Sequence, residues 1–130
     1  MIVVDASVVV DLLLDREPSA GRVTELTAGQ PLAAPHLLDA EVGHALRRGV
    51  LRGGLPASMA LAALDDLGRL RLVRHSHTAL LSRAFELRDN ATMYDGLYLA
   101  LAELLGATLV TRDKALARIP RVDARVEVIA

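Results

Sequence analysis

The sequence predicts a doubly wound α/β domain, and three observations point to it. The chain opens on the apolar run Met1–Val4, which leads directly into Asp5 and Ser7. Apolar runs without polar alternation are typical of strands that are covered on both faces, as in a parallel sheet. Segments with helical spacing separate further such runs, as expected for strands joined by helical crossovers. Because 52% of the residues are apolar, we expect one domain over residues 1–130.

Four further segments are predicted to be strands. The segment 31–34 is a weak strand, and 107–111 is apolar enough for a buried one. The segment 69–74 alternates leucine with arginine, which favours a short strand. A last strand is expected over 126–129, so that the sheet has five strands in all.

Helices are predicted where apolar residues recur at helical spacing or where start and stop residues bound a segment. Pro18 and Pro56 suit the first turn of a helix. The clearest helix lies between Thr92, which can cap its start, and Gly106, which suits the residue after its end. In chain order, the helices are expected over 7–14, 18–29, 37–50, 56–68, 78–87, 92–105 and 113–118.

The composition excludes several kinds of site. The chain has no cysteine, which excludes disulfides, thiolate zinc sites and cysteine nucleophiles and fits a cytoplasmic protein. No stretch approaches the roughly 18 apolar residues that span a bilayer, so no membrane association is expected. With a net charge of -1 and three aromatic residues, the chain would have to bind nucleic acid through local basic patches rather than a stacking platform.

Four carboxylates are expected to meet at one edge of the predicted sheet. The helix from Thr92 begins at the carboxyl edge, and the next strand returns there, so Asp95 and Asp113 share that edge. Asp5 ends the first strand, and Glu41 lies early in the helix after the second. Four such groups would repel and raise one another's pKa unless a cation held them. Oxygen ligands favour Mg²⁺ or Mn²⁺, which support water attack on a phosphodiester.

Each of these acids also has a structural interpretation. Thr92 and Asp95 have the spacing of a capping box. Asp113 would cap a short helix, and Glu41 on its own would be a solvated helix residue. Asp5 is the hardest to explain in this way, because a carboxylate at the end of an apolar strand needs a partner.

Four motifs give the chain a resemblance to a known family. They are Asp5-Ala6-Ser7, Glu41-Val42 in an apolar helix preceded by Pro35, the run from Tyr94-Asp95 to Ala102, and Thr111-Arg112-Asp113. In their order and spacing they resemble the PIN-domain ribonucleases, and most closely the VapC toxins of bacterial toxin-antitoxin pairs. The resemblance covers essentially the whole chain. It implies a five-stranded parallel sheet of order 3-2-1-4-5, with Asp5 and Asp113 on adjacent strands about 5 Å apart.

The resemblance also implies a chemistry. It makes the protein a Mg²⁺- or Mn²⁺-dependent endoribonuclease toxin that cleaves single-stranded or looped RNA, forms a homodimer and is blocked by a cognate antitoxin. Its metal-binding and catalytic residues would be Asp5, Glu41, Asp95 and Asp113, with Ser7 and Thr111 as supporting hydroxyls. Some relatives carry a further acid where this chain has Ala115 and Ala117, which argues against a complete second metal site. His44 stands where many relatives carry asparagine, and its role is open.

Basic residues near the predicted site are candidates for binding RNA phosphates. Arg112 and Lys114 flank Asp113, and Arg47 and Arg48 lie on one helix; for each, a solvated surface charge is the alternative. Tyr94 would be able to touch the substrate.

Other polar residues are expected outside the site. Asp11 and Asp15 are predicted to be exposed charges near a helix end, and His75 and His77 to be exposed. Tyr98, one turn beyond Tyr94 among leucines, is predicted to be a core residue.

Alternative functions are weighed against the same residues. A haloacid-dehalogenase-type phosphatase would need Asp-x-Asp where the chain has Asp5-Ala6-Ser7, and a receiver domain would need adjacent acids there. The pair Glu41 and His44 has the spacing of a di-iron helix, but a second such motif is missing. A catalytically inactive PIN-fold binding module and a different Mg²⁺-dependent phosphohydrolase stay open as alternatives.

Overall fold

The computed structural model describes residues 1–129 and contains a five-stranded sheet in which every strand is parallel to its neighbours. The strand order is β3-β2-β1-β4-β5, as the family resemblance implies. The strands are β1 Ile2–Val4, β2 Leu32–Pro35, β3 Leu72–His75, β4 Thr108–Thr111 and β5 Val126–Val128. The order changes direction at β1, so that the pair β1 and β4 forms the switch point at which such sheets carry their sites.

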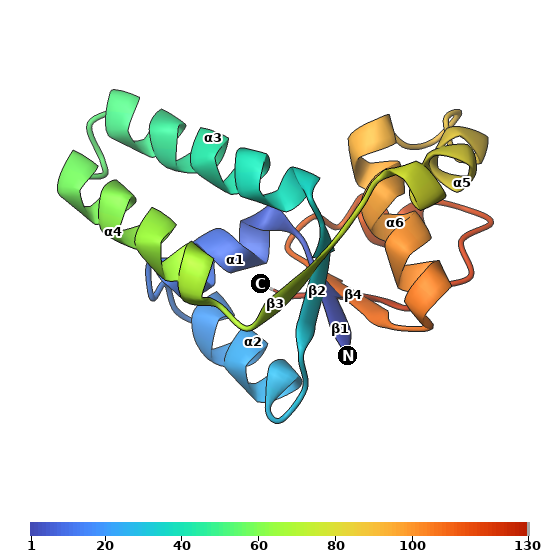
Figure 1. The fold of residues 1–130 in the computed structure, drawn as a ribbon, viewed down its shortest axis with the longest axis horizontal. Helices are drawn as coiled ribbons and strands as arrows, with labels where there is room; N and C mark the ends of the chain where they lie inside the picture. Colours follow the sequence, from blue (N-terminus) through green and yellow to red (C-terminus); the bar gives the residue numbers. More distant parts are fainter. Residues whose placement is uncertain (130) are drawn as a thin grey trace.

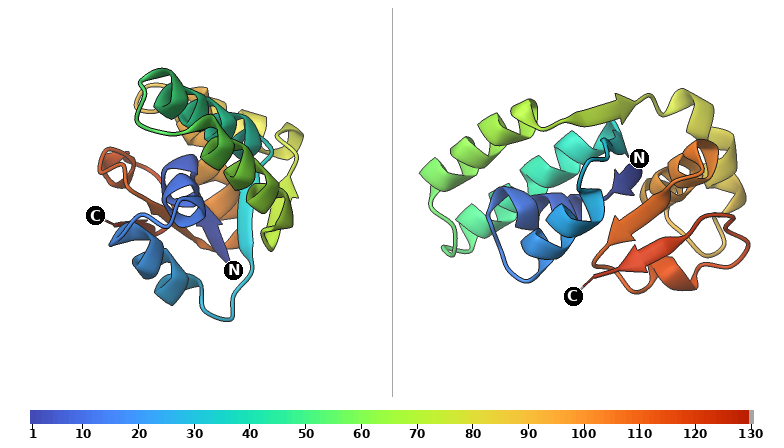
Figure 2. Two further views of the ribbon diagram at one scale, coloured as in Figure 1. Left: turned by 90° about the vertical axis from the view of Figure 1, so that its left-hand side faces the viewer. Right: turned by 90° about the horizontal axis from the view of Figure 1, so that it is seen from below.

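Two groups of helices cover the two faces of this sheet (Figures 1 and 2). The first four helices lie on one face, and the last two lie on the other. The helices are α1 Ala6–Leu13, α2 Ser19–Thr27, α3 Leu37–Leu51, α4 Ala57–Arg69, α5 Leu81–Glu86 and α6 Met93–Leu105. The doubly wound α/β class is therefore confirmed. No helix within residues 1–129 combines the length and the apolar character needed to cross a bilayer.

The centre of the core is formed by β1 and α6. Ile2, Val3 and Val4 are all buried, because β1 is flanked by strands on both sides and covered by helices on both faces. The seven residues 96–102 of α6 are also buried. Gly96 permits this close packing, because a Cβ at that position would lie 3.1 Å from the Cα of Ala84 in α5. This contact fixes the first turn of α6 and thereby the position of Asp95.

The helix expected over 92–105 is confirmed at both of its ends. The Thr92 side chain accepts a hydrogen bond from the Asp95 N–H at 3.1 Å, and Gly106 ends the helix with a left-handed φ of 59°. The helix expected over 113–118 is wrong in its length, because only a 3-10 turn forms there, over Leu116–Arg118. The Asp113 carbonyl oxygen accepts the N–H of Leu116, which closes the tighter turn.

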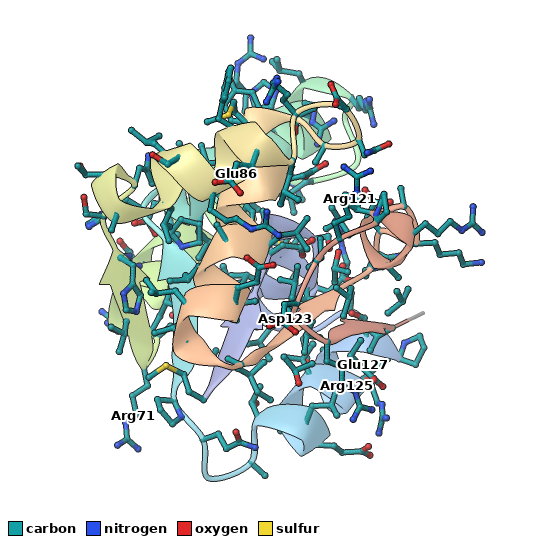
Figure 3. All side chains as sticks on the ribbon, turned by 90° about the vertical axis from the view of Figure 1, so that its right-hand side faces the viewer. Arg71, Glu86, Arg121, Asp123, Arg125 and Glu127 are labelled. Atoms are coloured by element: carbon teal, nitrogen blue, oxygen red, sulfur yellow. The ribbon has the colours of Figure 1, made fainter. Side chains whose placement is uncertain are left out.

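An ion-pair cluster between α5 and α6 also binds the segment that precedes β5. The Arg83 guanidinium of α5 binds Glu103 of α6 at 2.7 Å, Glu86 at 3.0 Å and the Arg121 carbonyl oxygen at 2.6 Å. Glu103 also accepts the Asp123 N–H at 2.7 Å. Figure 3 labels Glu86, Arg121 and Asp123 on this side of the molecule. Glu103 lies near the carboxyl end of α6, whereas Asp95 lies in its first turn, so these contacts hold the fold rather than the site.

Candidate functional site

Asp5 lies at the carboxyl end of β1 and caps the start of α1. Its carboxylate accepts hydrogen bonds from the Val8 N–H at 3.3 Å, from the Ser7 hydroxyl at 2.6 Å and from the Thr111 hydroxyl. The side chain is almost fully buried. Burial raises the pKa of the Asp5 carboxyl, although the hydrogen bonds from Ser7 and Thr111 act to lower it. Holding this group as an anion in the protein is therefore costly without a nearby positive charge.

The hydroxyls of Ser7 and Thr111 join Asp5 to the turn after β4. Val4 pairs with Val110, so that Thr111 is the β4 residue beside Asp5. The Thr111 hydroxyl oxygen also accepts the Asp113 N–H at 3.0 Å, and the Ser7 oxygen accepts the Arg112 N–H at 3.2 Å. Asp113 itself is exposed and lies two residues past the end of β4. The implied placement of Asp5 and Asp113 on adjacent strands is thus wrong, because Thr111 occupies that position.

The negative charges of the other three acids affect the pKa of the Asp95 carboxyl. Burial raises the pKa of the Asp95 carboxyl, and the negative charges of Asp113, Glu41 and Asp5 raise it further. The four acids come from α6, the turn after β4, α3 and the end of β1. Within residues 1–129, however, no three His, Asp or Glu side chains form a group in metal-site geometry. The four carboxylates therefore share one electrostatic environment without forming a closed set of ligands.

Glu41 has a buried partner that sequence reasoning did not identify. The Tyr98 hydroxyl of α6 donates a hydrogen bond to the Glu41 carboxylate at 2.6 Å. Tyr98 is only 2% exposed, so its predicted core position is confirmed, and burial together with Glu41 raises the pKa of its hydroxyl. The available signal was its spacing, because Tyr98 lies three residues after Asp95 and therefore on the same face of α6.

We predict that Tyr98→Phe lowers stability by about 1 kcal/mol, because it removes one hydrogen bond to a charged group while leaving no buried donor unpaired. Thermal melts would measure the change. Tyr94→Phe is the matched control, since Tyr94 is 61% exposed one turn earlier in the same helix. It should change stability by less than about 0.5 kcal/mol. Equal effects of the two variants would mean that the bond between Tyr98 and Glu41 contributes nothing.

We predict that Asp95→Asn stabilises the protein in EDTA, and that its advantage over the wild type grows with pH. A carboxyl whose pKa is raised by folding stabilises the fold below its unfolded pKa, and this contribution is lost as pH rises through the folded pKa. The difference in melting temperature should therefore increase from pH 3.8, the usual pKa of aspartate, toward neutrality. Asp65→Asn, the same change on the exposed face of α4, should give no such trend. A constant or shrinking difference would contradict the coupling of the acids.

The predicted basic residues divide into two pairs. Arg112 and Arg48 line a cavity that also borders Ser7 and Glu41. Arg47 and Lys114 are exposed and do not line this cavity within residues 1–129. His44, one turn after Glu41 in α3, lies at the cavity as well. Tyr94, the residue before Asp95, is exposed.

Three predictions of exposed residues are wrong. Asp11 is only 2% exposed, because it lies on the inner side of α1 and binds the Arg112 guanidinium at 2.9 Å. His75 and His77 are half-buried. The His77 imidazole nitrogen accepts the Leu37 N–H at 2.9 Å and so caps the start of α3 in place of a local side chain. The partners of Asp11 and His77 lie far away in the sequence, where local patterns give no signal.

Comparisons with known proteins agree with this architecture. The family model described as PIN domain matches residues 2–122. The chain is 44% identical to Ribonuclease VapC1 of Mycobacterium tuberculosis over 128 residues, which cover 98% of this chain and 96% of the relative. It is 41% identical to Ribonuclease VapC9 of the same species over 113 residues, covering 87% and 86% of the two chains. The fold is also similar to that of a chain in the crystal structure of VapBC2 from Rickettsia felis, which is bound to a promoter DNA fragment. The TM-score is 0.73, the sequences are 22% identical, and both chains are covered in full.

Proposed function

The chain belongs to the PIN-domain family as a VapC-type protein, and from this premise we propose that it is an endoribonuclease toxin neutralised by a cognate antitoxin. The relatives with 44% and 41% identity are both named ribonucleases. The similar fold in VapBC2 comes from a complex of two kinds of protein, which supports an antitoxin partner. RNA, single-stranded or looped, is the proposed substrate.

We propose that Asp5, Glu41, Asp95 and Asp113 hold Mg²⁺ or Mn²⁺. The observation that carries this proposal is that the sheet topology brings all four acids to one edge, where the charges of Asp5, Glu41 and Asp113 act on the Asp95 carboxyl. The residues fit such an ion in their chemistry, because all four supply carboxylate oxygens. Within residues 1–129 the four acids do not form a ligand set in metal-site geometry. When bound, the ion would supply a Lewis acid and an activated water for phosphodiester hydrolysis.

Neighbouring hydroxyl groups orient two of the four acids, Asp5 and Glu41. Ser7 and Thr111 donate to the two oxygens of Asp5 and so fix the plane of its carboxylate. The Tyr98 hydroxyl of α6 orients Glu41 by donating a hydrogen bond to one oxygen of its carboxylate. Because these donors are held by β4, α1 and α6, the carboxylates of Asp5 and Glu41 keep a fixed orientation before a cation binds.

Exposed apolar side chains on α4 provide a surface for a partner chain. Met59, Leu61 and Leu64 are 49%, 65% and 40% exposed, while Ala60, Ala63 and Leu67 of the same helix pack into the core. An amphipathic antitoxin helix would cover these side chains. We further propose a homodimer, on the family resemblance. Light scattering should then give twice the chain mass of 13.9 kDa.

The proposed activity is tested by incubating purified protein with a labelled oligoribonucleotide and Mg²⁺ or Mn²⁺, and by determining the chemical ends of the products. Attack by water predicts internal cleavage without a 2′,3′-cyclic phosphate end, because the ribose hydroxyl does not take part. An inactive binding module would leave the RNA intact. A phosphohydrolase with another substrate would release inorganic phosphate from small esters and leave internal bonds uncut.

A further inference from the structure

A cavity with a volume of about 290 Å³ lies beside the four acids, between α1, α3 and the turn after β4. We call it the arginine cavity. Its polar lining consists of Ser7, Asp11, Arg16, Glu41, His44, Arg48 and Arg112. Ser7 binds Asp5 and Glu41 is one of the four acids, so the cavity adjoins the proposed catalytic site directly. Three arginines line this cavity beside two carboxylates, Asp11 and Glu41, so its lining has a formal charge of +1 in a chain whose net charge is -1.

Asp11 forms ion pairs with two of these arginines. Its carboxylate binds the Arg112 guanidinium at 2.9 Å and lies 4.0 Å from that of Arg16. The Asp11 side chain is 3% exposed, whereas the Arg112 and Arg16 side chains are 49% and 54% exposed. Within residues 1–129, Asp11 is the only side chain that pairs with either guanidinium. Because a guanidinium has five N–H donors, both arginines keep donors free for a ligand.

We propose that the arginine cavity is a phosphate subsite, which holds the backbone phosphate next to the scissile one in bound RNA. Guanidinium groups bind phosphate through paired, charge-assisted hydrogen bonds. Asp11 is a positioning residue in this proposal, because it acts on the RNA through Arg112 and Arg16. The inference rests on the proposed ribonuclease function and deepens it by assigning the substrate path. RNA is favoured over an acidic protein segment because the cavity shares Ser7 and Glu41 with the catalytic site.

The proposal is tested by binding of a fluorescent single-stranded oligouridylate in EDTA, where metal-dependent cleavage is stopped. Asp11→Asn removes a negative charge, so long-range electrostatics alone would make RNA bind equally well or more tightly. The positioning role predicts the opposite, a severalfold weaker binding, because the arginines lose the anion that holds them. Asp15→Asn is the matched control, an exposed aspartate near the end of the same helix, and should not weaken binding.

A second variant tests the subsite without touching a buried residue. Arg48 is exposed on α3, so Arg48→Gln should leave the melting temperature unchanged. It should weaken binding about tenfold, the loss expected for one charged hydrogen-bond partner, and reduce the slope of log K against log salt by about 0.7. Arg71→Gln, at the opposite edge of the sheet (Figure 3), should change neither quantity.

The double variant Asp11→Asn with Arg112→Gln separates positioning from general destabilisation. If Asp11 acts through Arg112, the second substitution should add less than its separate effect. Equal or tighter RNA binding by Asp11→Asn would overturn the positioning role, and unchanged binding by Arg48→Gln would overturn the subsite. No binding by the wild type would also overturn it. Cleavage by the wild type with unaffected variants would leave the proposed function standing and overturn the subsite. Weakened binding by the variants without any cleavage by the wild type would contradict the ribonuclease and leave the cavity as a site that binds RNA phosphate without a scissile bond beside it.

Discussion

Asp5→Asn is expected to abolish RNA cleavage and to leave the fold as stable as the wild type, or more stable, in EDTA. Asp5 is the most buried of the four acids, and its raised pKa shows that its charge is unfavourable in the folded chain. The amide keeps the shape and can still accept the hydrogen bonds of Ser7 and Val8. The amide lacks the charge that would bind a cation. We expect a loss of about 4 kcal/mol of transition-state stabilisation, which corresponds to about a thousandfold lower rate.

Asp65→Asn serves as the control for this experiment, because it makes the same chemical change at an exposed position of α4. It should leave cleavage unchanged. The rate would be followed with a labelled oligoribonucleotide, and the fold by thermal melts in EDTA. A strong destabilisation of Asp5→Asn in EDTA would show that its carboxylate is held by favourable contacts alone, and the account of repelling acids would then be wrong.

Mg²⁺ or Mn²⁺ is expected to raise the melting temperature of the wild type. An ion that binds only the folded chain stabilises it by about 2.7 kcal/mol when its concentration is roughly 100 times the dissociation constant. For a domain of this size, that corresponds to a shift of about 10 °C. The shift should be largest near neutral pH, because protonation of Asp5 and Asp95 competes with the metal and both carboxyls have raised pKa values.

The control is the same titration with Asp5→Asn, in which the shift should shrink strongly because one ligand is lost. Sodium chloride at matched ionic strength corrects for general screening. A wild-type melting temperature that stays constant at millimolar metal, or an equal shift in the variant, would show that the ion does not bind at Asp5.

Much of the fold is predictable because its signals are local. The capped helix from Thr92 to Gly106 depends on residues within one turn of each end, and the buried strand β1 on an uninterrupted apolar run. Once strands and helices alternate, the carboxyl ends of the strands must meet at one edge. The gathering of Asp5 and Asp95 at that edge follows from topology, without any knowledge of side-chain contacts.

The side-chain contacts that the sequence did not predict join distant parts of the chain. Asp11 and Arg112 are separated by 101 residues, and Glu41 and Tyr98 by 57. Asp11 lies in a short apolar helix that is buried or half-buried along its whole length, so its charge alone led to the prediction of an exposed position. The register between β1 and β4, which sets Thr111 beside Asp5, likewise depends on pairing across the sheet.

We propose that four carboxylates at the edge of the sheet cut RNA with the help of a divalent cation. The most direct measurement is cleavage of one oligoribonucleotide by the same protein sample, first in EDTA and then after Mg²⁺ or Mn²⁺ is added in excess. The account predicts no cleavage in EDTA, full recovery with metal in the wild type and no recovery in Asp5→Asn. Cleavage that persists in EDTA, or that Asp5→Asn carries out at the wild-type rate, would contradict it.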